Sequence, residues 1–243
     1  KIYPQDDPNE FYTNCTSVRT DVQNNVYVCG YTTQTVGEDS QAVLLLLKYA
    51  PGGARQWAVR HGMIGYTDVN PLDMKLTDDG FLYVAGRIYS SSGYRVCLAK
   101  YTLDGELVWF AVDDQIMDDI ILRSFAISDS GDIVIVYRGR DNDAVRTYSV
   151  VLRYNQDGQI VYTDRNAFST LQIDVINQQI ICDSQNNAHL LGMIRDHLNQ
   201  TDQTFYMKYP NDYACQPPLA CDLDRDCICG LNDLLLFCEN WLK

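Results

Sequence analysis

The sequence predicts an all-β protein, a β-propeller of four four-stranded blades, and three observations lead to this fold. The first is that a basic residue followed by tyrosine recurs four times, at intervals of 52, 53 and 55 residues. The second is that a glycine and then an aromatic residue follow the first three of these pairs. The third is that a turn and a run of apolar residues precede every pair. The pairs are Lys48-Tyr49, Lys100-Tyr101, Arg153-Tyr154 and Lys208-Tyr209, and the aromatic residues are Trp57, Trp109 and Tyr162.

The apolar runs have the features of β-strands, because they are short, rich in valine, isoleucine and tyrosine, and bounded by Asp-Gly, Ser-Gly or Asn-Asn turns. In the second repeat we expect four strands, at 72–76, 81–88, 95–101 and 106–112. The second of these strands is apolar on both faces, so its sheet must be covered on both sides. Stacked sheets satisfy this requirement, and four strands in each repeat of roughly 50 residues favour a propeller.

The propeller is expected to occupy residues 1–210, and its repeats lie near 13–62, 63–115, 116–167 and 168–210. In the fourth repeat, Pro210 stands where a glycine turn and a closing strand are expected. Two arrangements are therefore open. Either residues 1–12 supply the missing outer strand and the ring closes, or the four blades form an arc that another chain completes.

Two stretches of the sequence also resemble a known repeat. They are NNVYVCGYT…LLLLKYAPGGARQW, within residues 24–57, and DGFLYVAGRI…CLAKYTLDGELVW, within residues 79–109. Both are similar to the SBBP-type propeller repeat of secreted bacterial proteins, and the resemblance extends over about residues 10–210. It implies a propeller fold, in a family that often has more than four blades.

After a linker at 211–220, residues 221–243 are expected to form a small calcium-loop and helix module. The spacing of acidic residues matches an EF-hand loop, in which alternate residues converge on one Ca²⁺ ion. The candidate ligands are the carboxylates of Asp222, Asp224, Asp226 and Asp233 and the backbone carbonyl of Ile228. The alternative is an acidic loop that is held by cysteines and binds no metal.

An apolar stripe follows this loop at helical spacing. Its members are Leu231, Leu234, Leu235, Cys238, Trp241 and Leu242. Loop and helix together resemble half of a type I dockerin, which implies that the five candidate ligands hold calcium. Cys227 stands where the family's loop has glycine, and dockerins that bind cohesin carry two such segments where this chain shows one.

Cysteine usage indicates an oxidising compartment, because five of the nine cysteines crowd into the C-terminal segment. We expect local disulfides there and a location outside the cytoplasm: secreted, in a periplasmic-type compartment or at the cell surface. The sequence would then begin at Lys1 after removal of a signal peptide. The disulfide candidates are Cys215, Cys221, Cys227, Cys229 and Cys238; Cys15, Cys29, Cys97 and Cys182 are expected to be buried thiols.

Charge and motifs exclude several classes of function. A net charge of −13 argues against nucleic-acid binding, and the absence of a long apolar run argues against membrane insertion. His189 lies in an apolar strand and is expected to be a core residue, whereas the aspartate pairs at 113–114 and 118–119 are expected in solvated loops. No metalloprotease, phosphate-loop or serine-hydrolase motif is present.

These observations favour a non-enzymatic binding or scaffold protein outside the cytoplasm, in which the propeller is a rigid platform for protein partners and the calcium-stabilised tail docks. Two alternatives remain open. One is a structural subunit of a larger filament or surface assembly. The other is a propeller enzyme, a hydrolase or lyase, whose site on one rim combines residues too far apart in sequence to form a motif.

Overall fold

The structure is a computed structural model that describes residues 10–36, 39–62, 65–141, 146–168, 173–196 and 199–211. Every regular element in these ranges is a β-strand, which confirms the all-β prediction, and no helix there could span a membrane. The strands are β1 (Glu10–Thr20), β2 (Val26–Val36), β3 (Asp39–Tyr49), β4 (Arg55–His61), β5 (Asp68–Leu76), β6 (Phe81–Ser90), β7 (Gly93–Thr102), β8 (Leu107–Val112), β9 (Asp119–Ile127), β10 (Ile133–Asp141), β11 (Arg146–Tyr154), β12 (Ile160–Phe168), β13 (Ile173–Cys182), β14 (Ala188–Asp196) and β15 (Thr201–Tyr209).

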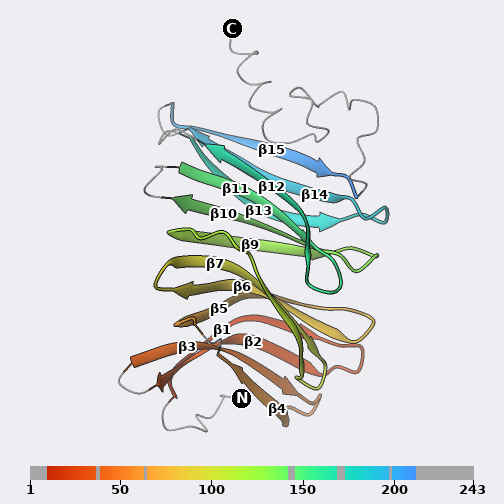
Figure 1. Ribbon diagram of the computed structural model, residues 1–243. Helices are drawn as coiled ribbons and strands as arrows, with labels where there is room; N and C mark the ends of the chain where they lie inside the picture. The colour runs from red at the N-terminus through yellow and green to blue at the C-terminus, as the bar shows by residue number, and fades with distance from the viewer. Residues whose placement is uncertain are drawn as a thin grey trace. The chain divides into compact units, whose positions relative to one another are not determined.

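The chain forms two compact units, Lys1–Ile120 and Ile121–Lys243. In the first unit, β1–β4 and β5–β8 are two antiparallel meanders in which each strand pairs with the next (Figure 1). A parallel bridge between Ala42 and Asp68 joins them into one sheet. The four strands expected in the second repeat are thereby confirmed as β5–β8, and the first of them begins earlier than expected.

In the second unit, β9–β12 form a four-stranded meander and β13–β15 a three-stranded one. Among the described residues, no fourth strand joins β15, in keeping with Pro210 at its end. In one of the two open arrangements residues 1–12 supply this strand, and residues 10–12 do not do so. These begin β1, which a short turn places beside β2, from Thr20 opposite Val26 to Glu10 opposite Gln34.

A β-bulge in the first strand of a meander recurs opposite a glycine in the second. Register shifts fall between Cys15 and Ser17 opposite Gly30, between Pro71 and Asp73 opposite Gly86, and between Asn177 and Gln179 opposite Gly192. A Cβ atom on Gly30 would lie 1.9 Å from the backbone oxygen of Asn14, and one on Gly86 would lie 2.4 Å from that of Asn70. The bulged backbone therefore occupies the space of a side chain.

The repeated basic residue links one meander to a turn of the next. Lys48 Nζ and Trp57 Nε1 both donate to the carbonyl oxygen of Leu103, at 3.1 and 3.2 Å. In the second unit, Arg153 donates to the backbone oxygen of Asn186 and to the side chain of Asn211. The first and third basic-Tyr pairs thus mark contacts between successive meanders of the same unit.

The core lies between the meanders of each unit. In the first unit, Leu44 and Leu46 of β3 pack with Leu82 and Val84 of β6. In the second unit, one cluster joins the β9–β12 meander to the β13–β15 meander; its members include Val134, Val136, Val151, Ile180, Leu190, Phe205 and Met207. The inner strands β10 and β11 are buried on both faces.

The bulge contact yields a test of stability. We expect Gly86→Ala to lower the free energy of unfolding by about 1 to 3 kcal/mol, because the added methyl group collides with the backbone of the β5 bulge. Gly52→Ala is the matched control, since a Cβ there meets nothing within 4 Å. Urea denaturation measures both variants, and equal stability of the two would contradict the proposed role of the bulge.

Candidate functional site

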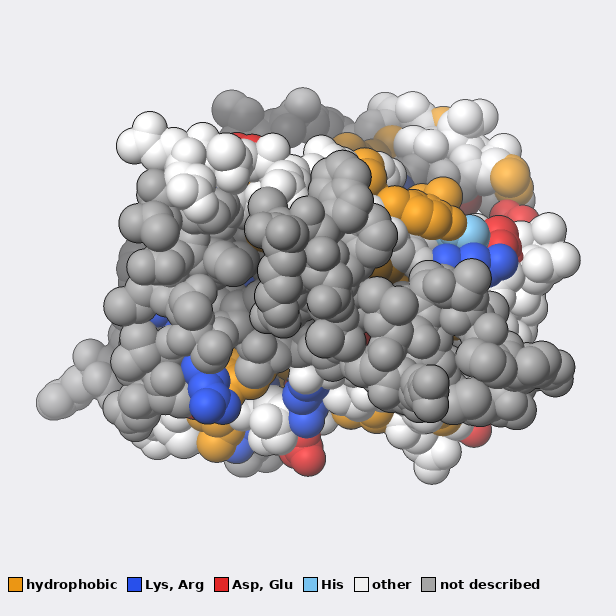
Figure 2. Space-filling view, turned by 90° about the horizontal axis from the view of Figure 1, so that it is seen from above, with side chains coloured by type: hydrophobic (Ala, Val, Ile, Leu, Met, Phe, Trp, Pro, Cys, Tyr) orange, Lys and Arg blue, Asp and Glu red, His pale blue; other side chains and the backbone are white. Residues whose placement is uncertain are grey.

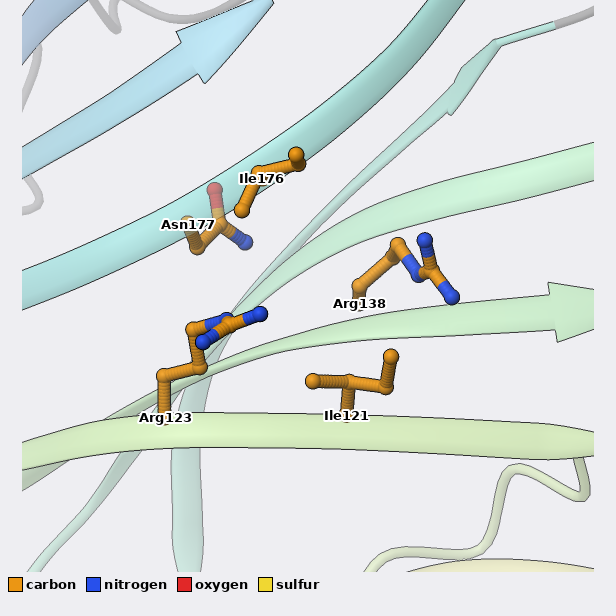
Figure 3. A pocket seen from close by; sticks show the side chains of 5 residues that line it. All are labelled: Ile121, Arg123, Arg138, Ile176 and Asn177. Atoms are coloured by element: carbon orange, nitrogen blue, oxygen red, sulfur yellow. The ribbon is translucent and has the colours of Figure 1, made fainter.

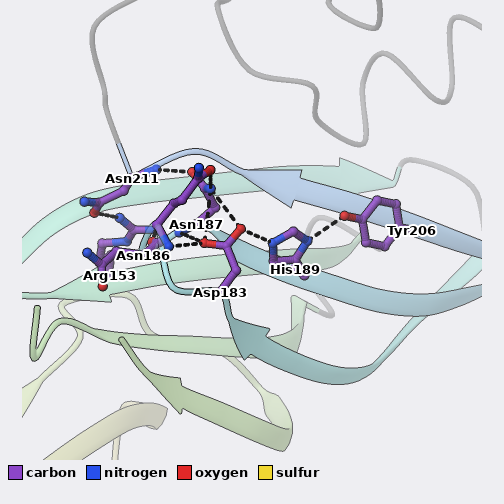
Figure 4. Close-up of polar contacts among 8 residues, drawn as sticks. Arg153, Asp183, Asn186, Asn187, His189, Tyr206 and Asn211 are labelled. Carbon is purple, nitrogen blue, oxygen red and sulfur yellow. Dashed lines mark hydrogen bonds and ion pairs between the residues drawn. The ribbon is translucent and has the colours of Figure 1, made fainter. Parts of the chain in front are cut away.

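A chain of hydrogen bonds crosses the ends of the last three strands (Figure 4). Asp183 follows β13, His189 lies in β14 and Tyr206 lies in β15. The Nε2 atom of His189 is 2.8 Å from Asp183 Oδ2, and its Nδ1 atom is 2.5 Å from the hydroxyl of Tyr206. The two rings are stacked, with centroids 5.8 Å apart.

Strand alternation places His189 and Tyr206 on the same face of the sheet. In β15, Phe205 and Met207 point into the core, so Tyr206 between them points outward and is 62% exposed. In β14, His189 lies between the buried residues Ala188 and Leu190. The Tyr206 hydroxyl is therefore the solvent-facing end of the hydrogen-bond chain.

The same outward face carries further apolar side chains. Leu191, which pairs with Tyr206, is exposed, and so is Ile181, which pairs with His189. Seen from above, Figure 2 shows hydrophobic side chains beside a histidine and acidic and basic side chains. The polar chain thus lies next to exposed apolar side chains.

Asp183 is held as an anion by the turn that it begins. The backbone N–H groups of Gln185 and Asn187 donate to Asp183 Oδ1, each at 2.9 Å, and Asn187 Nδ2 donates to Oδ2. Asn186 adopts a φ of 63°, a conformation that asparagine tolerates. The hydrogen bonds from the Asn187 side chain and from His189 hold the pKa of the Asp183 carboxyl well below its usual range.

This anion fixes the tautomer of His189. The Asp183 carboxylate accepts only, so Nε2 of the neutral imidazole carries the proton and donates it. The lone pair then lies on Nδ1, which accepts the hydroxyl proton of Tyr206. The arrangement can withdraw a proton from the tyrosine and return it, which is the step that general acid–base catalysis needs.

His189 was expected in the core, and this prediction is wrong. Its strand is buried on one face only at this position, and the pleat turns His189 to the other face. The alternation Phe205-Tyr206-Met207-Lys208 is the signal that places Tyr206 on the outer face, and the pairing of β14 with β15 then places His189 on the same face.

The predicted calcium ligands and disulfide cysteines lie outside the described residues. They are Asp222, Asp224, Asp226, Ile228 and Asp233, and Cys215, Cys221, Cys227, Cys229 and Cys238. Within the part of the chain that is described, no group of three or more histidine, cysteine or acidic side chains could hold a metal ion.

The other four cysteines are free thiols and differ in burial. Cys29 and Cys97 are buried, as expected, and burial raises the pKa of the Cys97 thiol to about 12. Cys182 is half-buried. Cys15 is exposed, so the expectation that it is buried is wrong; it stands at the bulge, where the regular alternation of β1 is interrupted.

Another expectation fails at Asp113, which is fully buried although a solvated loop was predicted. The backbone N–H of Asp113 donates to Val96 at 2.9 Å, which continues the ladder past the end of β8. Asp114 and Asp118 are exposed, as expected.

Thiol burial yields a test by alkylation. With iodoacetamide at pH 8, we expect Cys15 to react in the native protein and Cys29 and Cys97 to react only after unfolding, because burial blocks access and suppresses their thiolates. Peptide mass spectrometry measures modification at each position. Labelling of Cys97 in the native protein as fast as that of Cys15 would contradict the packing.

The sequence matches no protein-family model and no curated protein. Several solved structures are similar to it, and they include the following three enzymes. An ulvan lyase, a polysaccharide lyase, has a TM-score of 0.48 and 11% identity, over 87% of this chain and 58% of the lyase. An endo-arabinase from Bacteroides thetaiotaomicron has a TM-score of 0.41 and 8% identity, over 82% of this chain and 74% of the arabinase. A β-fructofuranosidase from Bombyx mori has a TM-score of 0.41 and 13% identity, over 80% of this chain and 48% of the enzyme.

These comparisons correct the expectation of a non-enzymatic binding or scaffold protein. The three similar structures are those of enzymes, whereas a non-enzymatic protein was expected. The chain spans about half to three-quarters of their length. Because every identity is 13% or less and every TM-score is below 0.5, no residue role, substrate or reaction passes from them to this chain.

Proposed function

We propose that this chain is an enzyme, a hydrolase or lyase, in which Tyr206 exchanges a proton with the substrate under the control of His189 and Asp183. The observation that carries this proposal is the continuous chain of hydrogen bonds from the Asp183 carboxylate through His189 to an exposed hydroxyl. Hydrolysis and elimination both need such a group, because each moves a proton to or from the reacting atoms.

The proposed relay works by charge compensation. When His189 takes the proton of Tyr206, the imidazole becomes a cation, and the adjacent Asp183 carboxylate stabilises it. The tyrosine oxygen is then a base that can take a proton from water or from a carbon next to a carbonyl group. Tyr206 can then donate this proton to the leaving group, after which His189 returns its own proton to the tyrosine oxygen and both side chains are neutral again.

A comparison of the four repeats supports a function for His189 beyond closing its turn. Each repeat has a side chain that caps the corresponding turn by accepting the backbone N–H four residues later: Asp21, Thr77, Ser128 and Asp183. Two residues after that N–H, the first repeat has Tyr27, whose hydroxyl donates to Asp21 at 3.1 Å. Among these four described turns, only the fourth has a histidine at this position. Each of the two ring nitrogens of His189 makes a hydrogen bond.

We infer further that the four meanders are successive propeller blades of the SBBP type. The recurring bulge, the capped turn and the basic-Tyr contact support this arrangement. In a propeller, loops and strand ends gather at one rim, and substrates bind there. A location outside the cytoplasm is part of the same proposal.

The proposed relay is tested with Tyr206→Phe, which removes one hydroxyl group. Activity is first located with p-nitrophenyl glycosides and with neutral and uronate-containing polysaccharides, followed by release of reducing ends and by the ultraviolet absorbance of unsaturated products. We expect Tyr206→Phe and His189→Gln to lower kcat by about 10²- to 10⁴-fold, because each breaks the proton path.

Tyr27→Phe is the matched control, since it removes the hydroxyl that donates to Asp21 in the equivalent turn of the first repeat. It should leave kcat unchanged. Full activity of Tyr206→Phe on a substrate that the parent protein converts would refute the proposed role of Tyr206, and so would an equal loss in both variants.

We also propose that Asp222, Asp224, Asp226, Asp233 and the carbonyl of Ile228 bind one Ca²⁺ ion, on the grounds of their spacing. Calorimetric titration of the chelator-treated protein with CaCl₂ should show a single site. Asp222→Asn with Asp224→Asn should abolish this binding, because two of the four carboxylates lose their charge. No heat in the parent protein would contradict the calcium assignment.

A further inference from the structure

The outer face of the fourth meander, β13–β15, differs from the equivalent faces of the other three. All four meanders pair their second and third strands in the same register, so the residues that correspond to Leu191 and Tyr206 can be identified. They are Cys29 and Leu46, Ala85 and Leu98, and Val136 and Val151. All six are buried, whereas Leu191 is 44% and Tyr206 is 62% exposed. Positions that the other meanders keep from water are therefore open in the fourth.

The basic residues of the four repeats show the same difference. Lys48, Lys100 and Arg153 are buried, whereas Lys208 is exposed. Lys208 lies opposite His189 in the register, so it belongs to the same outer face. In the first and third meanders, the basic residue at this position donates to the following meander. Lys208 occupies the position from which such a contact is made.

In the first and third meanders, this face packs against the segment that follows in the chain. Leu46 lies in one apolar cluster with Leu82 of the second meander. Val151 lies in one apolar cluster with Leu190 of the fourth meander. By the same rule, the segment that covers Leu191 and its neighbours is the one that follows β15.

The inner face of the fourth meander is already occupied. Asn177 of β13 is buried, and its Nδ2 donates to the backbone oxygen of Tyr137 in β10 at 3.2 Å. Asn177 also lines a small hollow together with Arg123 and Arg138 of the third meander (Figure 3). The third meander thus covers this face, which leaves the outer face for the segment after β15.

We propose that the apolar stripe within residues 231–242 packs on the outer face of the fourth meander. This stripe lies outside the described residues, and its members are Leu231, Leu234, Leu235, Cys238, Trp241 and Leu242. A helix with such a stripe needs an apolar surface to cover it, and the exposed side chains of Ile181, Leu191 and Tyr206 provide one.

The length of the chain allows this contact. Residues 212–230 connect β15 to the stripe and reach up to about 60 Å when extended. The nine-residue strand β15 is about 30 Å long, so the stripe can reach any part of the outer face. Because the segment is tethered, its effective concentration at this face exceeds that of a separate molecule.

Charge complementarity supports the same pairing. At 3.6 residues per turn, Glu239 falls at the border of the stripe, and Asn240 falls on the side opposite to it. The Glu239 carboxylate can therefore meet the exposed ammonium group of Lys208, whereas Asn240 faces solvent. The packed segment also shields the hydroxyl of Tyr206. Its consequence for activity rests on the proposed function, but the packing itself does not.

Hydroxyl-radical footprinting of the full chain tests the contact, with labelling at Tyr206 and Trp241 measured by peptide mass spectrometry. We expect the double variant Leu235→Asp with Trp241→Asp to raise labelling at Tyr206 by about threefold or more, because a buried carboxylate opposes packing of the stripe. Conversely, Leu191→Asp should raise labelling at Trp241.

Two variants are matched controls. Asn240→Asp adds the same charge on the opposite side of the proposed helix, and Val108→Asp adds it at a position of β8 that is 48% exposed. Both should leave labelling at Tyr206 and Trp241 unchanged. Circular dichroism of each variant, with the β-sheet spectrum of the parent protein expected, excludes unfolding as the cause of a change.

Equal labelling at Tyr206 in the parent protein and in the double variant would overturn the proposal, and so would an equal effect of Asn240→Asp. Protection of Tyr206 that weakens on dilution would overturn it in favour of a second copy of the chain. On a substrate that the parent protein converts, the double variant should raise kcat/KM. An unchanged kcat/KM with raised labelling would refute the shielding of the relay, whereas an inactive parent protein would count against the proposed function alone.

Discussion

Sheets that are apolar on both faces make each meander depend on its neighbours, and the other features of the structure follow from this constraint. All five residues from Ile133 to Tyr137 are buried although consecutive side chains point to opposite faces. Side chains on both faces of a strand can be buried only when its sheet lies between two other layers of protein. The repeated contacts between meanders meet the requirement: Lys48 and Trp57 reach the Leu103 carbonyl in the first unit, and Arg153 reaches Asn186 in the second.

The β13–β15 meander departs from this pattern, and the candidate site lies where it does so. One face packs on the core through Phe205 and Met207, and the other exposes Tyr206 and Leu191. A residue on that outer face is free of the packing demands that constrain the inner strands. Asp183 caps its turn in the same way as the equivalent residues cap the turns of the other repeats. This capping bond belongs to the fold, and the proposed chemistry depends on further residues at the same turn.

The proposed activity rests on one position. Tyr27 in the first repeat closes its turn by donating to Asp21, which ends the hydrogen-bond chain. His189 donates to Asp183 in the same way and has a second nitrogen left, so the chain continues to Tyr206. Imidazole has two hydrogen-bonding atoms on opposite sides of its ring, whereas a phenol has one, and this difference converts a turn contact into a proton path.

The sequence by itself determined the strands, the turns and the period of the repeats, because alternation, Asp-Gly turns and the basic-Tyr pairs are local signals. It did not show the outward position of His189, the exposure of Cys15 or the meeting of Arg123, Arg138 and Asn177. A bulge changes which face the later side chains occupy, and residues on different strands meet only through register. These relations depend on pairing and packing between distant segments, and therefore only the tertiary structure decided them.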